Sequence, residues 1–273
     1  MRCCGLLYET YTDGALNVRQ PFAIRSRWRV ATDRMAIDGI PRYAWEVPTK
    51  TYGQMCPLAR SLDVLGERWT ILVIRELLLG PKRFKHLLAV LPAIGSNRLA
   101  ERLRGLEEAQ TIRKRTLPPP AAVAVYELTE EGERLRDPLI ALGLWGLDLP
   151  LDDRIDPETA RAELIALCLA GTQTNLLDPS RRETFEFHVR DEVFHFQLHH
   201  GRFLPRSGPS PTDPTVKIAC DLQTFMDLAL RQLTPSQALK DGRATILAGS
   251  RSSLAEVFRV LAYTPQAPLP VHA

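Results

Sequence analysis

The feature that most constrains the fold of this 273-residue chain is a change of hydrophobic period near residue 110. Before that point, apolar residues recur every three to four positions, which is the period of amphipathic helices. After it, residues 112–116 and 123–128 are β-type runs separated by a segment with three consecutive prolines, Pro118, Pro119 and Pro120. Proline lacks the N–H group that a strand ladder needs, so the segment predicts a stiff loop between paired strands.

Four helices are predicted before this change of period. Leucines at 58, 62 and 65 lie at helical spacing and end at Gly66, and residues 69–79 are too apolar for a surface helix. A short helix at 84–90 is closed by Pro92, and Ser96 is the expected N-cap of a helix over 97–109. One more helix is predicted after the strands, from Thr129 to Trp145. The order is therefore four helices, strand, loop, strand and helix.

Basic residues concentrate in this region. Residues 82–116 hold nine lysines and arginines against three glutamates, although the net charge of the whole chain is only +3. A cluster of positive charge is typical of a nucleic-acid surface, but it is equally found on a solvated face of a helical bundle. The major groove of DNA admits one helix, whose first side chains reach the base edges, and Ser96, Asn97 and Arg98 occupy that place here.

Several short motifs recur in order through this part of the chain. They are Cys56-Pro57-Leu58, Leu65-Gly66-Glu67-Arg68-Trp69, Arg75-Glu76-Leu77, Arg83-Phe84, Leu99-x-x-Arg102-Leu103 and Tyr126-x-Leu128-Thr129. Together they make residues 52–148 resemble the HxlR family of bacterial transcriptional regulators. The resemblance implies a winged helix-turn-helix domain over residues 51–148, a homodimer whose terminal helices pair, and a palindromic double-stranded DNA operator.

Carried over by position, the resemblance makes residues 96–109 the recognition helix and the proline hairpin the wing. The tip of this wing is less charged than in many relatives, which puts its contact with the minor groove in doubt. The candidate DNA-binding residues are Ser96, Asn97, Arg98, Glu101, Arg102, Arg113, Lys114 and Arg115.

Cysteine usage points to reduced thiols, because five cysteines form no C-x-x-C pair and leave one unmatched. Cys56 falls where redox-sensing members of the family carry a reactive cysteine, and a position near a helix N-terminus favours the thiolate. The alternative, a small packing residue in front of Pro57, is favoured by the sequence.

A second domain is predicted at 158–265, after an acidic linker at 149–157. Its pattern is α+β: a helix at 158–169, strands at 184–188, 193–198, 202–204, 216–220 and 244–248, and helices at 222–232, 235–239 and 252–263. The strand Val193-Phe194-His195-Phe196, the helix start at Asp221-Leu222 and the pair Gly242-Arg243 resemble a sterol-carrier-protein-like fold.

That resemblance implies a tunnel for a lipid or another apolar small molecule. Six phenylalanines are candidates to line it, although aromatic residues at such spacings more often form an ordinary core. They are Phe185, Phe187, Phe194, Phe196, Phe225 and Phe258.

No metal, cofactor or catalytic site is predicted. His188, His195, His199 and His200 lie close together in sequence, but no cysteine or carboxylate completes a tetrahedral set, so solvent-facing histidines of a hairpin are expected. The sequence contains no nucleophile elbow, phosphate-binding glycine loop or H-E-x-x-H motif, which argues against an enzyme.

Residues 1–50 are expected to be an irregular extension and 266–273 a tail. A start of translation at Met35 is a hypothesis that intact-mass analysis tests. The chain shows no apolar run of about 20 residues and no signal-peptide core, so a cytoplasmic protein without a membrane partner is expected.

These features favour a mainly α chain in which a winged helix-turn-helix domain precedes a sterol-carrier-like α+β domain. The predicted function is sequence-specific regulation of transcription, with a second domain that senses an apolar ligand. The alternative is a lipid carrier whose winged domain serves dimerisation.

Overall fold

The structure is a computed structural model that describes residues 51–147, 149–150, 154–173 and 177–261. The predictions for residues 1–50, for Met35 and for the tail at 266–273 lie outside these residues. None of the helices in the described ranges has the length and apolar character needed to cross a bilayer.

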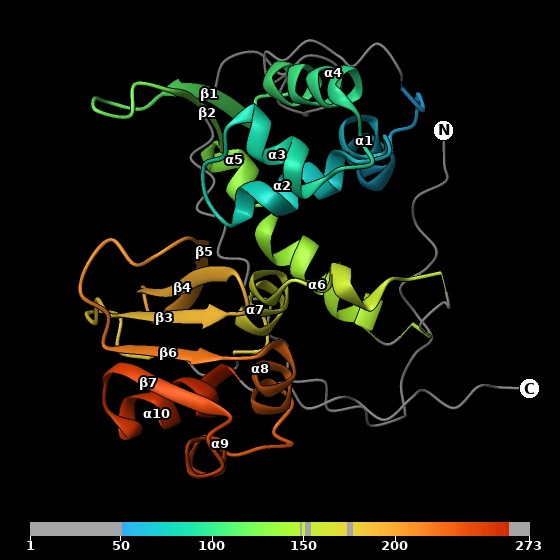
Figure 1. Ribbon diagram of the computed structural model, residues 1–273. Helices are drawn as coiled ribbons and strands as arrows, with labels where there is room; N and C mark the ends of the chain where they lie inside the picture. The colour runs from blue at the N-terminus through green and yellow to red at the C-terminus, as the bar shows by residue number, and fades with distance from the viewer. Residues whose placement is uncertain (1–50, 148, 151–153, 174–176, 262–273) are drawn as a thin grey trace, which may run out of the picture. The chain divides into compact units, whose positions relative to one another are not determined.

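Four helices form the first part of the N-terminal domain, in the order that the sequence predicts (Figure 1). Residues such as Ile74, Leu78, Leu99 and Leu103 are buried between them and form one apolar core. Helices α2, α3 and α4 each bury apolar side chains, as the spacing of their leucines predicts, whereas α1 has no buried residue and only Val64 and Leu65 pack partly against the core. The helices are α1 (Pro57–Leu65), α2 (Thr70–Leu78), α3 (Phe84–Val90) and α4 (Ser96–Glu108).

The predicted hairpin follows as β1 (Ile112–Thr116) and β2 (Ala124–Leu128), which pair antiparallel. The main chain of Lys82 adds a short third edge, because its N–H donates to the carbonyl of Tyr126 (3.0 Å) and the Tyr126 N–H donates back (2.8 Å). Helices followed by this small sheet make a winged helix-turn-helix fold.

The single helix predicted from Thr129 to Trp145 is wrong, because the structure has two helices there: α5 (Glu130–Glu133) and α6 (Arg136–Leu147). Thr129 caps the first one, its side chain accepting from the N–H of Gly132. Pro138 explains the break. It has no N–H to donate to the carbonyl of Arg134, and its ring clashes with that carbonyl in a continuous helix. In the first turn of α6 the missing N–H costs nothing.

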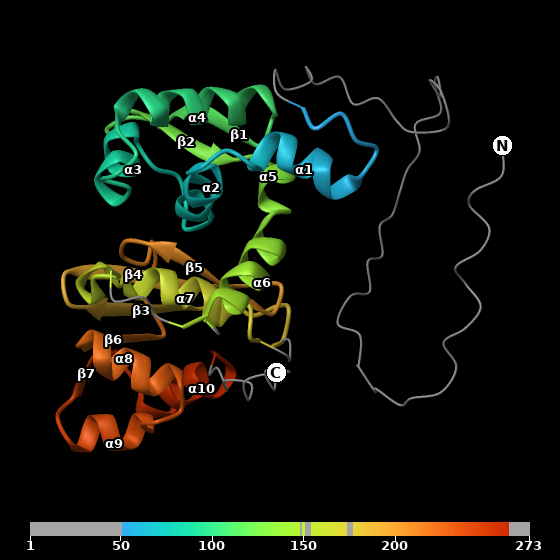
Figure 2. The ribbon, with the colours of Figure 1, turned by 90° about the vertical axis from the view of Figure 1, so that its right-hand side faces the viewer.

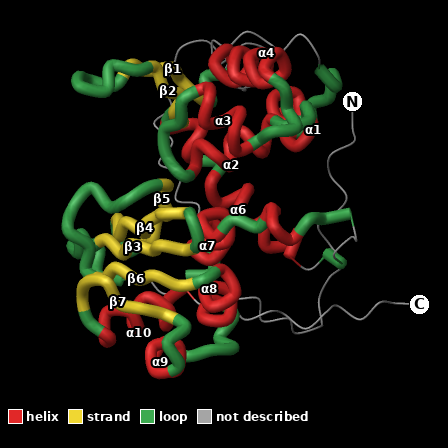
Figure 3. Tube along the Cα trace, viewed as in Figure 1, coloured by secondary structure: helices red, strands yellow, loops and turns green. Residues whose placement is uncertain are grey.

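The C-terminal domain combines helices with a five-stranded sheet, whereas strands in the N-terminal domain are confined to the wing (Figure 3). The strand order is β5-β4-β3-β6-β7, in which β3 and β6 are parallel and the other neighbours antiparallel. The strands are β3 (Thr184–Val189), β4 (Glu192–His199), β5 (Arg202–Ser207), β6 (Val216–Cys220) and β7 (Ala244–Gly249).

Helices cover the apolar face of this sheet, and Figure 2 shows two of them, α7 and α8, in front of the strands. Side chains at alternate positions of β3 and β4, such as Phe185, Phe187, Phe194 and Phe196, point into the core. The period of two read from the sequence is thereby confirmed. The elements are η1 (Pro157–Thr159), α7 (Ala162–Ala170), α8 (Leu222–Ala229), α9 (Pro235–Lys240) and α10 (Arg251–Leu261).

Helix α7 begins later than residue 158, where the sequence predicted its start. Residues 157–159 form a separate 3₁₀ turn, and Arg161 is extended. The free N–H groups of Ala162 and Glu163 instead donate to the carboxylate of Glu192, at 3.0 and 3.2 Å. A cap supplied from a different part of the chain leaves no local signal in the sequence before the helix.

Candidate nucleic-acid interface

Helices α3 and α4 form the helix-turn-helix, joined by a turn at residues 91–95. Gly95 closes this turn with φ +71°, a left-handed conformation that glycine adopts at little cost. Gly95 rather than Ser96 is the N-cap residue of α4, and no side chain caps the helix. The predicted cap by Ser96 is therefore wrong: glycine at the cap satisfies the turn geometry and moves Ser96 into the first helical turn.

The first turn of α4 presents three exposed side chains, those of Ser96, Asn97 and Arg98. Leu99, Leu103 and Leu106 of the same helix are buried in the domain core, which fixes the direction of the exposed face. Asn and Arg are the side chains best suited to bidentate contacts with base edges, and α4 offers both at its start.

Arg102, one turn further on, is largely covered, with 14% of its side chain exposed. Its guanidinium lies 3.2 Å from Glu67 and 2.7 Å from Glu101. Through Glu67, Arg102 therefore connects α4 to the segment before α2. It contributes to the stability of the domain in addition to any contact with DNA.

The wing carries three exposed basic side chains on β1: Arg113, Lys114 and Arg115. Both arginines donate to one carboxylate on β2, that of Glu127, at 2.8 Å and 2.9 Å from their Nε atoms. The hydrogen bonds from Arg115, which has the larger effect, and from Arg113 lower the pKa of Glu127, although burial alone would raise it. Glu127 thus holds the two arginines on one side of the wing and offsets part of their charge.

Lys114 points to the other side of β1 and lies over the ring of Tyr126, with its Nζ 5.8 Å from the ring centroid. Tyr126 is also its cross-strand neighbour in the hairpin. A cation over an aromatic face is held weakly in place, and the ammonium stays accessible to a phosphate.

One member of the basic cluster is absent from the surface. Lys82 has 8% of its surface exposed, and burial, opposed by the charge of Glu76, lowers the pKa of its ammonium. Counting Lys82 among the surface cations is therefore wrong. Lys82 lies four residues after the end of α2, and the charge pattern alone carries no information about its burial.

Cys56 is exposed and occupies the N-cap position of α1, in front of Pro57. Its exposure contradicts the interpretation of Cys56 as a packing residue. Cys168 and Cys220 are different, because burial raises the pKa of both thiols, that of Cys220 to about 12.

The six candidate phenylalanines all lie in the core of the C-terminal domain. Their rings contact one another: Phe187 stacks on Phe194 with centroids 5.4 Å apart, and Phe225 meets Phe194 edge-on at 5.5 Å. These are the contacts of a packed aromatic core. An apolar ligand among these rings has to displace some of the contacts.

His195 is buried, so the expectation that the hairpin histidines all face solvent is wrong. Its Nδ1 donates to the carbonyl of Gly208 at 2.9 Å, where the loop after β5 folds over the polar face of the sheet. His188 donates to Glu186 at 2.7 Å. In the described ranges, no three His, Cys, Asp or Glu side chains form a group suited to a metal ion.

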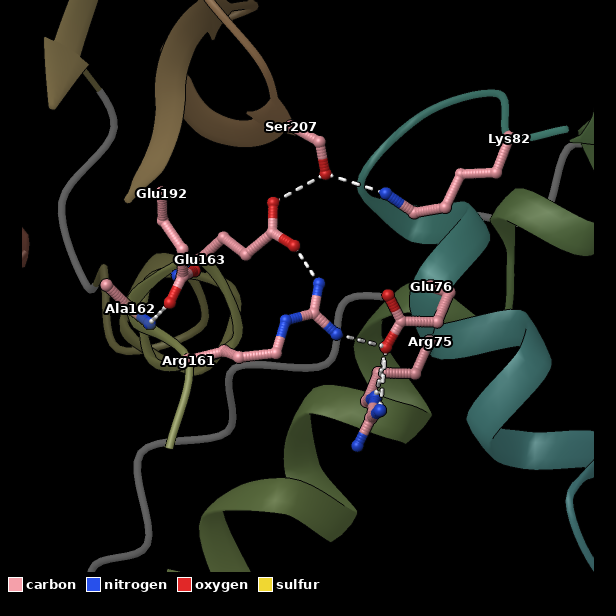
Figure 4. A network of polar contacts seen from close by, with 8 residues as sticks. All are labelled: Arg75, Glu76, Lys82, Arg161, Ala162, Glu163, Glu192 and Ser207. Atoms are coloured by element: carbon pink, nitrogen blue, oxygen red, sulfur yellow. Dashed lines mark hydrogen bonds and ion pairs between the residues drawn. The ribbon is translucent and has the colours of Figure 1, made fainter. Parts of the chain in front are cut away.

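A polar network that sequence reasoning missed joins the two domains (Figure 4). Glu76 of α2 is fully buried and accepts from Arg161 at 3.0 Å and from Arg75 at 2.6 Å. Arg161 also bonds Glu163 of α7. The available signal was the charged pair Arg75-Glu76 in the middle of an otherwise apolar helix, because a buried carboxylate needs partners.

Apolar contacts between α6 and α7 extend this junction. Leu167 of α7 is buried in the core of the N-terminal domain. A Cβ placed on Gly171 would lie 2.0 Å from Ile140 of α6, and one on Gly143 would lie 3.1 Å from the sulfur of Cys168. The two domains therefore fit closely along these helices.

Comparison with known families gives two matches that divide the chain as the fold does. Residues 64–150 match the HxlR-like helix-turn-helix family, and residues 164–247 match the SCP-2 sterol transfer family. The second match agrees with the α+β fold of the C-terminal domain.

Individual relatives match the N-terminal domain. The HTH-type transcriptional regulator YodB of Bacillus subtilis is 38% identical over 92 residues, which are 33% of this chain and 82% of YodB. The regulator sll1512 of Synechocystis is 36% identical over 96 residues, covering 35% of this chain and 71% of sll1512. A solved structure of quinone-bound YodB covers 34% of this chain and 100% of its own, at 33% identity and a TM-score of 0.30. The chain belongs to the HxlR family of helix-turn-helix transcriptional regulators and carries a domain of the SCP-2 sterol transfer family behind its DNA-binding fold.

Proposed function

We propose that this regulator binds a specific double-stranded DNA operator through the first turn of α4 and the wing. The observation that carries the proposal is the exposed Ser96-Asn97-Arg98 turn at the start of a helix whose opposite face is buried. Arg113, Lys114 and Arg115 supply the exposed positive charge on the wing that phosphates require.

Binding of the purified protein to its own upstream intergenic DNA, compared with scrambled DNA over a range of salt, tests this proposal. A preference of about 10³ or more with a steep salt dependence supports specific binding. Equal, weak binding to both DNAs at every salt concentration contradicts specific binding at that site.

Two variants then locate the surface. Arg98→Ala should weaken binding to the preferred DNA by about tenfold or more, because a bidentate base contact contributes about 1–3 kcal/mol. Arg251→Ala is the matched control, since Arg251 is also exposed but lies on α10 of the C-terminal domain. Equal affinity of the two variants would move the DNA-binding surface away from α4.

The same proposal includes a homodimer on a palindromic operator. Large apolar side chains are exposed on α1 and α6, among them Leu58 (67%), Leu142 (47%) and Trp145 (60%). Exposed apolar side chains grouped on two helices are suited to a second copy of the chain, which covers them.

For the C-terminal domain we propose binding of an apolar small molecule that shifts the DNA-binding equilibrium. The match of residues 164–247 to the SCP-2 sterol transfer family favours this role. Titration with a fluorescent fatty acid, followed by DNA binding at saturation, is the test. Binding of this probe without any change in DNA affinity favours the alternative of a carrier whose winged domain serves dimerisation.

A further inference from the structure

The side chain of Lys82 connects the wing with the C-terminal domain. Its main chain forms the edge of the wing sheet beside Tyr126, with hydrogen bonds of 3.0 and 2.8 Å. Its ammonium leaves the wing and donates to the hydroxyl of Ser207, at the end of β5, at 2.8 Å. A single residue is therefore part of both structures.

The hydroxyl of Ser207 is held on its far side as well. It donates to Glu163 at 2.6 Å, and the main-chain N–H of Ser207 donates to the carbonyl of Leu79 at 2.9 Å. Glu163 belongs to the first turn of α7, which Glu192 of β4 caps. Figure 4 shows the hydroxyl between the carboxylate of Glu163 and the ammonium of Lys82.

On the wing, the chain of contacts continues to a candidate DNA contact. Tyr126 lies between Lys82 on one side and Lys114 on the other, since Lys114 is its partner in the β1–β2 register. The ammonium of Lys114 also lies over the Tyr126 ring. Four residues thus connect the start of α7 to the exposed charge of the wing: Glu163, Ser207, Lys82 and Tyr126.

We propose that Lys82 is a positioning residue, through which Ser207 and Glu163 of the C-terminal domain hold the wing in its DNA-binding conformation. A buried ammonium that loses its acceptor moves toward water, and the Lys82 main chain moves with it, away from Tyr126. A ligand that moves α7 or the end of β5 is thereby able to change the wing. The effect on DNA affinity rests on the proposed function, whereas the effect on the wing does not.

Hydrogen exchange of the whole chain carrying Ser207→Ala tests the proposal without DNA or ligand. The amides of Lys82 and Tyr126 should exchange about tenfold faster than in the wild type, because the local opening that frees them is easier. Ser207→Thr keeps a hydroxyl and should restore the wild-type rates. Ser210→Ala is the matched control, because the hydroxyl of Ser210 bonds Thr184 and Thr212 within its own domain.

Unchanged rates at Lys82 and Tyr126 would overturn the proposal, as would an equal increase in exchange across both domains. Lys82→Met gives an independent check: in that background, Ser207→Ala should add no further increase at Tyr126, because coupled residues are not additive. An additive increase would also refute the coupling.

DNA binding gives a separate result. Ser207→Ala should lower affinity for the preferred upstream DNA at least about threefold, although Ser207 is no part of the basic surface, while Ser210→Ala should not. If the wild type binds no DNA specifically, the proposed function fails, and hydrogen exchange still decides whether Lys82 positions the wing.

Discussion

At the scale of single residues, the polar face of the C-terminal sheet is organised around Glu186. Burial alone would raise the pKa of this carboxyl, but hydrogen bonds from Lys217, His188 and the N–H of Ser210 lower it to about 2. The three donors lie at 2.8, 2.7 and 2.7 Å. The ionised carboxylate thereby joins β3, β6 and the loop after β5.

Because Glu186 is ionised in the folded chain, we expect the stability of the C-terminal domain to fall at acidic pH. The pKa of Glu186 is lower in the folded than in the unfolded chain, so its contribution to stability is complete above about pH 4.5 and is lost as the pH falls toward 2. The depression corresponds to about 3 kcal/mol. In urea unfolding from pH 7 to pH 3, Glu186→Gln should be less stable than the wild type, with a difference that shrinks on acidification. A difference that is constant with pH would contradict this role.

Thiol reactivity should separate the described cysteines. Cys56 is exposed, whereas burial raises the pKa of Cys168 and Cys220. Iodoacetamide at neutral pH should therefore label Cys56 first in the folded chain, as peptide mass mapping can follow, because the thiolate is the nucleophile. A rate at Cys56 no faster than that of a free thiol argues against redox sensing, and faster labelling of Cys168 contradicts the burial.

Residues of the apolar stripes were predictable, and residues with distant partners were not. Leu99, Leu103 and Leu106 follow the helical period and are buried as expected. Lys82 and Glu76 are buried because partners from residues 161–207 reach them, and the sequence around these two residues does not identify those partners. For the proposed DNA-binding surface, the sequence predicted the elements and their order, but it did not predict the ion pairs of Arg102 with Glu67 and Glu101.

At the scale of helices and strands, a boundary was predictable where neighbouring residues set it and was not predictable where a distant residue does. Helix α3 has the predicted bounds, because a proline and local periodicity set its end. The start of α7 depends on Glu192, about 30 residues later in the chain, and was predicted too early. The alternation of apolar and polar residues in β3 and β6 likewise does not predict that these two strands pair in parallel.

The exposed apolar side chains of α1 and α6 give a prediction about assembly. Trp145→Glu should shift the chain toward monomer, because a charge introduced at a dimer interface loses its hydration when the subunits meet. Sedimentation velocity over a range of concentrations measures the shift. Leu247→Glu on β7 is the control, since Leu247 is also exposed (51%) but belongs to the C-terminal sheet. Equal effects of both variants would place the subunit contact elsewhere.

At the scale of the whole molecule, the two domains share buried charges. A chain that ends after residue 150 keeps Glu76 and Lys82 but loses Arg161, Glu163 and Ser207. It also exposes the apolar surface that Leu167 covers. We expect this shortened chain to melt at least about 5 °C below the N-terminal domain within the full chain, because unpaired buried charges are strongly destabilising. Calorimetry of both proteins tests this, and equal melting temperatures would contradict it.

The junction at Lys82 also limits how such a protein can be rebuilt from parts. If the C-terminal domain is exchanged for that of a relative, a replacement without a hydroxyl at position 207 and an acid at position 163 leaves the ammonium of Lys82 without these partners. A biosensor that joins a new ligand-binding module to this N-terminal domain therefore needs a hydroxyl and an acid at the positions equivalent to 207 and 163. Without them, the wing would change because Lys82 has lost its contacts and not because a ligand has bound.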